Sequence, residues 1–473
     1  MTSFHHLRVL AALTVAALPL AIPVAPLQIA RAQANLASEP VIRSQQLRAL
    51  PGELDEVLML NDNNPELITG EGILVSTFPQ GPGLNLALNG RFDLFSHHVY
   101  AGQPEALDST LWLAVMAQPV GDEPVTLQLL GGSTSLSQAT SKGQTAAPFL
   151  PLPALMAETG TPIAAGPGSR VAGDLLRGDT APELPQEWRI APGASTPLVV
   201  LPLPVAGLDP LLNGRNLQMR MHSSGPVHLA TLAVYGDGKG DRAPSVKHMQ
   251  TLLRSGRQSP KEHEPTPRGA KGRIIYSRVS GVQIGSTWRA TLTDPGANDL
   301  NVVDAPVSWP ISSLEHGDLQ TGQVQTAELK VFDAGTAWAA HGNYGVEYDL
   351  TLPLTNRGST QRTVAIALES PERKSSNPKQ LVFSNSNSGP VMFRGPIEVT
   401  GLDGEDQSPS GKRRFHLVLR RGQKGPRLGQ ITLDPGQSRS IRVRLIYPAD
   451  ATPPQVLSIL PVKQSTSASN DRP

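Results

Sequence analysis

The sequence predicts an all-β protein with two tandem β-sandwich-like modules, joined by a linker that carries one short helix. Glycine and proline number 44 each in 473 residues, and aromatic residues make up only 4%. This composition is typical of short strands joined by many turns. Segments in which apolar and polar residues alternate also recur at roughly ten-residue spacing with turn residues between them, which favours a sandwich.

Residues 1–34 differ from the rest and are predicted to be a secretory signal peptide. Arg8 and two histidines precede an apolar run at 9–20, and alanines at 30, 32 and 34 offer cleavage sites. Prolines cut the apolar run short of the roughly 20 residues that a membrane-spanning helix needs. An uncleaved anchor is the alternative. We expect an exported protein, in the periplasm or at the cell surface, with no transmembrane segment after cleavage.

Charge and cysteine content exclude several classes of function. Loss of Arg8 and Arg31 with the signal peptide leaves a chain close to neutral, which gives no support to nucleic-acid binding. The chain contains no cysteine, so disulfides, thiolate metal sites and cysteine nucleophiles are excluded.

The predicted N-terminal module covers residues 35–240. Its residues 51–72 carry six acids and neither lysine nor arginine. Asn89-Gly90 predicts a hairpin turn, and Ser223-Ser224-Gly225 predicts a second one. The span 133–197 is rich in proline and glycine, with one helical turn predicted at 171–177. Strands are predicted at 72–78, 84–88, 91–100, 111–117, 124–130, 198–205, 217–221 and 226–234.

Residues 241–270 are predicted to be an exposed linker, because they are charged and rich in proline and glycine. Their first part, 245–255, is amphipathic and predicts a helix with Val246, Met249, Leu252 and Leu253 on one face. A C-terminal β-sandwich module at 271–462 and a disordered tail at 463–473 follow. Strands are predicted at 273–279, 287–293, 342–354, 363–369, 391–394, 397–400, 414–420, 440–447 and 455–461.

The two modules show the same order of parts, which indicates an internal duplication. APGASTPLVVLPLPV at 191–205 and DPGQSRSIRVRLIYP at 434–448 each join a proline-glycine turn to a long strand. Each closes a block that opens with two strands about 80 residues earlier. The alternative is that turn patterns common to all sandwiches imitate a repeat.

The strand GRFDLFSHHVY carries the sharpest candidates for chemistry. Arg91, Asp93 and His97 share one face of an extended chain, whereas the neighbouring His98 points to the other. Because the two histidines diverge and no third ligand is identifiable, a half-buried strand is favoured over a metal site. His341, in the turn HGNYG, could approach His97 in space.

No motif for an enzyme is present. The chain lacks a G-x-S-x-G elbow, an H-E-x-x-H pair, a Walker loop and a dinucleotide-binding fingerprint in a strand-helix setting. AGPGSRVAGDLLRG at 165–178 could cradle an anion, but a turn leading into a short helix explains it as well and is favoured.

Calcium is the metal that the acidic loops would suit. Asp62 and Glu66 in one loop, and Asp403 and Asp406 in another, could supply oxygen ligands, as could the loop at 237–241. None of these loops matches a complete calcium-binding pattern, and solvated turns have the same composition. Apart from this, we expect no cofactor.

The strongest charge asymmetry lies at 401–448, a segment that contains ten lysines and arginines but only four acids. On two predicted strands the basic residues alternate with apolar ones, which predicts a cationic sheet face. Such a face suits an acidic glycan, lipid head groups or an acidic protein. The alternative is a solvated face with charges that protect a sheet edge. The predicted face consists of Arg414, His416, Arg420, Arg442 and Arg444.

Seven stretches between about 50 and 460 resemble a cyanobacterial family of exported proteins described only as a domain of unknown function. The resemblance implies an envelope-targeted protein of a photosynthetic bacterium and supplies no activity, cofactor or catalytic residue. The stretches are LPGELDEVLMLNDNNPEL, EGILVSTFP, GRFDLFSHH, AGPGSRVAGDLLRG, GRIIYSRVSGVQIGSTWRATLTD, HGNYGVEYDLTLPL and MFRGPIEV.

Together these features predict a non-enzymatic binding or structural component of the cell envelope, which engages acidic polysaccharide or an envelope protein. An envelope-polymer hydrolase with unidentified carboxylates and a periplasmic protein-protein adaptor are the alternatives. The sequence predicts no oligomeric state.

Overall fold

The computed structural model of the chain describes residues 40–102, 110–138, 152–159, 166–237, 242–272, 274–275, 277–373, 377, 379–386 and 388–463, apart from the side chains of residues 65 and 66. In this part of the chain, strands account for 49% of the residues and helices for 6%, which confirms the predicted mainly β class. No helix among these residues is both long and apolar enough to cross a membrane. The predicted signal peptide and the predicted tail from residue 464 lie outside the described residues.

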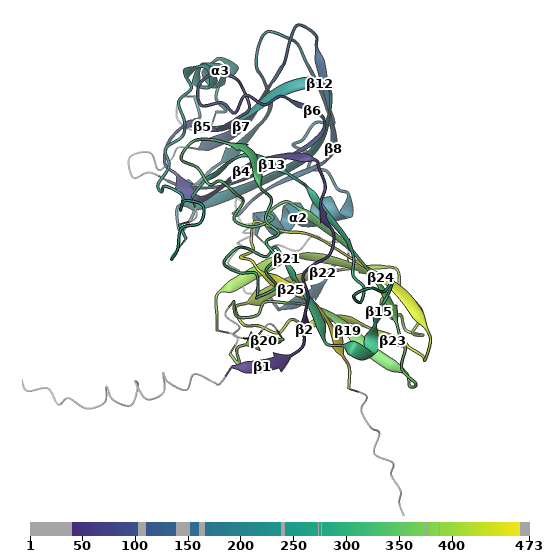
Figure 1. Ribbon diagram of the computed structural model, residues 1–473. Helices are drawn as coiled ribbons and strands as arrows, with labels where there is room; N and C mark the ends of the chain where they lie inside the picture. Colours follow the sequence, from purple (N-terminus) through teal and green to yellow (C-terminus); the bar gives the residue numbers. More distant parts are fainter. Residues whose placement is uncertain are drawn as a thin grey trace, which may run out of the picture. The chain divides into compact units, whose positions relative to one another are not determined.

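The largest sheet has ten strands and comes mainly from the N-terminal half (Figure 1). Its order is β10-β8-β12-β6-β4-β13-β17, while β11 pairs with β7, and both β5 and β7 pair with β12. Its strands are β4 (Leu58–Ile68), β5 (Gly72–Ser76), β6 (Leu88–Ala101), β7 (Leu111–Pro119), β8 (Val125–Leu136), β10 (Glu187–Ile190), β11 (Thr196–Leu203), β12 (Leu212–Tyr235), β13 (Val279–Ile284) and β17 (Leu329–Phe332).

Both hairpins predicted in the N-terminal half are wrong. Asn89-Gly90 lies inside β6, and Ser223-Ser224-Gly225 lies inside the 24-residue strand β12. The two sites face each other, because the register between β12 and β6 shifts between Ser223 and Val227, which pair with Gly90 and Leu88. The turn residues of both strands therefore lie at one irregularity in the pairing of β6 with β12. There β12 changes partners, from β6 and β8 to β5 and β7, and the chain does not reverse.

Two further sheets form most of the C-terminal half. One has eight strands in the order β3-β14-β18-β24-β21-β22-β9, with β15 paired to β18, and the other has five in the order β2-β16-β25-β19-β23. A separate pair joins β1 to β20. The bounds are β1 (Val41–Ser44), β2 (Gln46–Leu47), β3 (Glu53–Leu54), β9 (Leu155–Ala157), β14 (Thr287–Thr291), β15 (Leu300–Asn301), β16 (Val307–Ile311), β18 (Glu347–Thr355), β19 (Arg362–Glu369), β20 (Gln380–Phe383), β21 (Val391–Thr400), β22 (Lys412–Arg420), β23 (Arg427–Leu433), β24 (Ser438–Ile446) and β25 (Gln455–Pro461), with a 3-10 turn η1 (Val302–Asp304).

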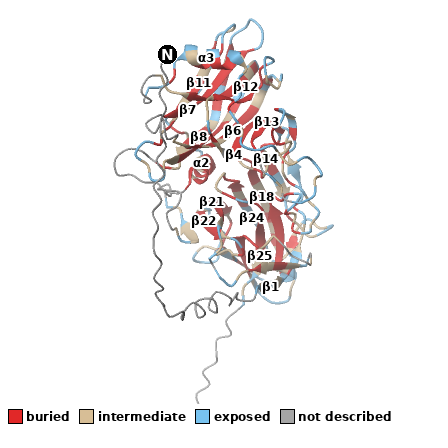
Figure 2. Cartoon of the chain, turned by 90° about the vertical axis from the view of Figure 1, so that its left-hand side faces the viewer, coloured by how far each residue is buried: buried red, intermediate tan, exposed pale blue. Residues whose placement is uncertain are grey.

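The eight-stranded and five-stranded sheets bury one core between them. On β18, Tyr348, Leu350 and Leu352 are fully buried, and Trp309 of β16 joins them from the opposite sheet. This is the alternation that a strand with one covered face requires. Figure 2 shows buried residues running along β18 and β24 in this half, and along β12 in the other.

Two helices pack on this framework. The helix α3 (Val246–Ser255) confirms the predicted helix and buries Met249 and Leu252 against the ten-stranded sheet, whereas Val246 is exposed. The helix α2 (Pro167–Arg177) is longer than the predicted turn. Its first position is a proline, which suits a helix start, and Gly178 ends it in the left-handed conformation.

Strand pairing does not follow the boundary predicted at 241–270. The strand β13, beyond this segment, extends the ten-stranded sheet of the N-terminal half. In the other direction, β1, β2, β3 and β9 precede the segment and pair with strands of the C-terminal half.

Three antiparallel pairings nevertheless occur in the same order in both halves. The opening strand pairs with the strand after the proline-glycine turn, as β7 with β11 and β18 with β24. The second strand pairs with the one before that turn, as β8 with β10 and β19 with β23. It pairs also with the last strand, as β8 with β12 and β19 with β25. The two turn-and-strand segments thus hold matching places in the pairing pattern.

Candidate binding cleft

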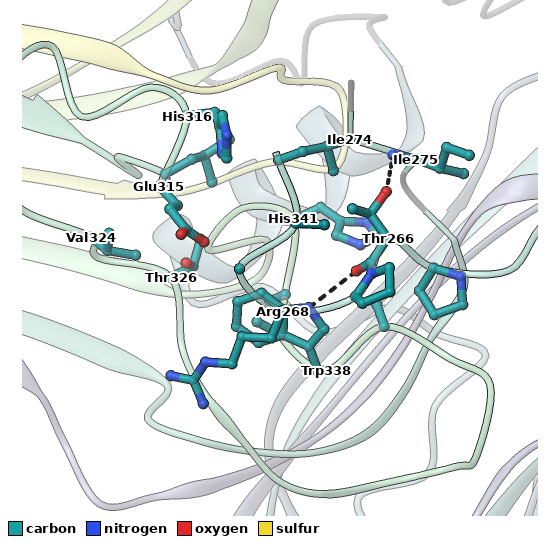
Figure 3. Close-up of a pocket in the computed structure, with 18 of the residues that line it drawn as sticks. Thr266, Arg268, Ile274, Ile275, Glu315, His316, Val324, Thr326, Trp338 and His341 are labelled. Atoms are coloured by element: carbon teal, nitrogen blue, oxygen red, sulfur yellow. Dashed lines mark hydrogen bonds between the residues drawn. The ribbon is translucent and has the colours of Figure 1, made fainter. Parts of the chain in front are cut away.

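A cleft of about 400 Å³ lies among connecting segments of the C-terminal half (Figure 3). Two exposed apolar side chains line it, Ile275 at 45% and Val324 at 51% exposure, together with the partly exposed Trp338. Apolar groups that gather around a concavity in contact with water are typical of a binding site. The other lining residues are Pro265, Thr266, Pro267, Arg268, Gly269, Ala270, Ile274, Leu314, Glu315, His316, Thr326, Glu328, Ala337, Ala339, Ala340 and His341.

Hydrogen bonds fix one wall of the cleft. The indole N–H of Trp338 donates to the carbonyl of Thr266 over 3.3 Å, and the hydroxyl of Thr266 accepts the backbone N–H of Ile275 over 2.7 Å. The guanidinium of Arg268 lies over the Trp338 ring at 5.0 Å and pairs with Glu328 at 3.2 Å. The aromatic ring is thereby held in one orientation, with a charged pair at the rim.

An inner cavity of about 300 Å³ adjoins the cleft, and Leu314 and His341 line both. In Figure 3 the imidazole of His341 lies centrally among the labelled side chains. The remaining lining residues of the inner cavity are Asn63, Asn64, His97, Val99, Tyr344, Arg373, Ala449, Thr452 and Pro453. They come from β4, β6 and the loops that lead into β18 and β25, except Arg373, which lies between β19 and β20.

The two candidate histidines do approach one another, in that His97 and His341 both line the inner cavity. Burial lowers the pKa of each to about 4, and the neighbouring His98 adds to the effect at His97. Both imidazoles are therefore neutral at pH 7, so they serve as hydrogen-bonding groups and not as cations.

The predicted divergence of the adjacent histidines is confirmed. His98 is fully buried on the other face of β6, with its Nε2 2.9 Å from the carboxylate of Asp62. On the His97 face, Arg91 forms an ion pair with Asp93, whose pKa is raised by burial. Neither Arg91 nor Asp93 lines the cleft or the inner cavity.

The arginines of the predicted cationic face are interleaved with acids. Arg442 contacts both carboxylate oxygens of Asp349 at 2.7 Å. Arg444 pairs with Glu347 at 2.6 Å and with Glu398 at 3.1 Å, and both glutamates are nearly buried. The positive charge of Arg442 and Arg444 is therefore balanced in space, because β18 and β21 place acids beside β24.

The rest of this face is also engaged. Arg414 pairs with Glu398 at 2.8 Å, and Arg420 donates to the carbonyl of Gly389 over 2.8 Å. His416 is only 2% exposed, so its expected place on an outer surface is wrong. The helix α2 covers it, and its Nε2 lies 3.0 Å from the hydroxyl of Ser169. Burial lowers the pKa of His416 to about 4, and Arg394 adds to this effect.

The glycine-rich stretch at 165–178 does hold an anion, which is a carboxylate of the chain itself. Asp450 accepts the backbone N–H of Ser169 over 2.6 Å at the N-terminus of α2, where the helix dipole favours negative charge. A Cβ on Gly166 would lie 2.4 Å from this carboxylate, so glycine permits the close approach. Burial raises the pKa of Asp450 to about 6, although hydrogen bonds from the helix start, Arg394 and Arg170 oppose the shift.

The calcium candidates are placed apart and are occupied by other partners. Asp62 accepts hydrogen bonds from the hydroxyls of Ser96 and Thr231 inside the ten-stranded sheet. Asp403 forms an ion pair with Arg439, and Asp406 is bound by Ser408 in an exposed turn. The Glu66 side chain lies outside the described residues, as does most of the loop at 237–241. Among the residues that the structure does describe, no three histidines or acids gather as metal ligands would.

Sequence reasoning missed Trp338 and Arg268 of the cleft and Arg373 of the inner cavity. They lie in connecting segments without periodic pattern, and no alternation marks them. The available signal was the unusual place of apolar residues such as Val324 and Ile275 in glycine- and proline-rich loops.

Fold and site together define a mainly β protein with an open cleft of mixed polarity and an adjoining cavity that shares two lining residues with it. Residues 45–461 match the family described as "Protein of unknown function (DUF3370)", and the chain belongs to this family. A comparison with curated proteins finds no match.

Proposed function

We propose that this protein is an exported, non-enzymatic binding component of the bacterial cell envelope, and that its ligand, an acidic polysaccharide, occupies the cleft. One observation carries the proposal: exposed Ile275 and Val324 flank Trp338 around a concavity that charged side chains also line. Exposure of these apolar groups to water is unfavourable in free energy, and a ligand that covers them would remove this exposure.

A sugar ring matches this mixed lining. Its C–H faces are apolar and can pack on an aromatic or aliphatic side chain, while its hydroxyls need donors and acceptors at the edge. Trp338, Ile275 and Val324 supply the apolar contacts, and Glu315 and His316 are exposed polar groups on the lining. Glu328, paired with Arg268, is 74% exposed at its side chain, so water reaches this carboxylate. A hydrolase would instead use a carboxylic acid shielded from water.

The matched pairings of the two halves also support the proposed duplication. In the N-terminal half, β11 pairs with β7 within the ten-stranded sheet. In the C-terminal half, β24 pairs with β18 and β21 in the eight-stranded sheet. Under this proposal the cleft segments at 265–341 lie between the two copies along the chain.

The test uses Trp338→Ala and Val324→Glu with polysaccharide isolated from the envelope of the native host. In affinity electrophoresis, both variants are expected to bind about tenfold more weakly than the wild type or worse, because one removes the ring and the other places a charge on the apolar rim. Phe332→Ala is the control, since Phe332 is an aromatic residue with 41% exposure outside the cleft. If the polysaccharide slows both cleft variants as much as it slows the wild type, the proposal is overturned.

A further inference from the structure

The inner cavity differs from the cleft in charge. Arg373 is the only residue charged at neutral pH among the described residues that line it, and no aspartate or glutamate lines it. The other polar groups are two asparagines, two neutral histidines, a tyrosine and a threonine. The lining is thus cationic and rich in hydrogen-bonding groups.

The guanidinium of Arg373 has spare donors. It donates to the carbonyl of Pro453, while its Nε is buried and meets no acceptor among the described residues. Two other shielded arginines of this half are paired with carboxylates: Arg439 with Asp403, and Arg444 with two glutamates. A buried donor atom without an acceptor is costly, and an arginine fork suits a planar oxyanion.

A second buried polar atom without a partner lies on the same lining. The Nδ1 of His97 is buried and has no hydrogen-bond partner in the described part of the chain. His97 lies on β6 beside Asn63 of β4, so a strand pair holds it in place. A neutral imidazole can donate one N–H, which adds to the donors of Arg373.

We infer that the inner cavity is an oxyanion subsite, in which Arg373 binds the carboxylate or sulfate group of an acidic glycan whose neighbouring sugar rings lie in the cleft. The inference rests on the proposed function, because the two spaces adjoin at Leu314 and His341, which line both. It makes Arg373 the residue that selects acidic over neutral glycans, whereas Trp338 contributes to binding of either kind.

The experiment compares oligogalacturonate with its fully methyl-esterified form by isothermal titration calorimetry on the full chain. The two probes share their sugar rings and differ in charge. The wild type is expected to bind the acid about tenfold more tightly or better, as charge-assisted hydrogen bonds allow. Arg373→Met is expected to lose this preference while still binding the ester, and Arg373→Lys to keep most of it. A sulfated carrageenan oligosaccharide forms a parallel arm, which shows whether sulfate is taken in place of carboxylate.

Arg442→Met is the matched control, because Arg442 pairs with Asp349 on an exposed strand face away from the cavity. It is expected to keep the wild-type preference. If Arg373→Met and Arg373→Lys both keep that preference, the subsite is overturned and binding in the cleft stands. If the wild type binds none of the three probes, the glycan proposal and the subsite fall together. Thermal unfolding of each variant separates loss of binding from loss of structure.

Discussion

Arg444 of β24 pairs with one carboxylate on each of the two strands beside it, Glu347 of β18 and Glu398 of β21. Glu347 and Glu398 have side chains only 8% and 2% exposed, and Arg444 contacts both, whereas Arg442 is 54% exposed and contacts one acid. Shielded ion pairs of this kind are strongly destabilising when one partner is removed, and exposed pairs contribute little. Arg444 and Arg442 therefore have different roles, although they are two residues apart on one strand.

We expect Arg444→Ala to lower the free energy of unfolding by about 2–3 kcal/mol and Arg442→Ala by about 1 kcal/mol or less. The first value lies below that for a fully isolated buried pair, because Glu347 keeps Arg220 and Glu398 keeps Arg414 as partners. Urea unfolding of the two variants measures the difference. Equal losses of unfolding free energy in the two variants would contradict the expectation that ion pairs with shielded glutamates contribute more to stability.

The same contacts explain why this face could be predicted only in part. The alternation of Arg442 and Arg444 with apolar residues was visible in the sequence, and both do point away from the core. The acids that balance them lie about 45 to 100 positions away along the chain, on β18 and β21. Charge counted over a window of sequence cannot include such partners, so it overstated the positive character of the surface.

At the scale of elements, α2 and the loop before β25 form a contact that depends on protonation. The carboxylate of Asp450 is buried at the start of α2, and its pKa is raised to about 6. Because the folded value is above the ordinary 3.8, the folded state holds this proton more tightly than the unfolded state does. The stability contributed by this group is therefore greatest below pH 3.8 and is lost as the pH rises through 6.

Asp450→Asn should remove this dependence on pH. Between pH 7.5 and pH 4.5, the wild type is expected to gain about 2 kcal/mol of unfolding free energy relative to the variant, as linkage requires for a shift of this size. Denaturant titrations of both proteins at the two pH values measure the difference, in which groups common to both, such as Asp333, cancel. A difference that does not change with pH would contradict a raised pKa at Asp450.

Elements with a strong local pattern were predictable. The helix at 245–255 and the alternating strands at 347–355 and 438–446 appear with nearly the expected bounds, because amphipathic period and turn residues act locally. Asn89-Gly90 and Ser223-Gly225 lie inside strands and do not form the predicted hairpin turns. Their dihedral preferences are local, but whether they reverse the chain or bend a strand depends on the partner strand.

For the whole molecule, the fold class could be predicted from the sequence, but the pairing of the strands in the sheets could not. Composition and turn spacing define a mainly β chain. The pairing of β13 with β4, and of β2 with β16, joins segments more than 200 residues apart. The cleft depends on the same long-range assembly, because its walls are loops that no periodic pattern describes. Of the predicted candidates, His97 and His341 alone line these cavities.

The central claim is that ligand binds in the cleft, and hydrogen–deuterium exchange with and without envelope polysaccharide from the native host tests it most directly. We predict slower exchange in peptides covering 265–275 and 337–341, with no change in β24, which carries Arg442 and Arg444. Slower exchange in β22 and β24 with the cleft peptides unchanged would contradict the account, because it would place the ligand on the strand face with paired charges.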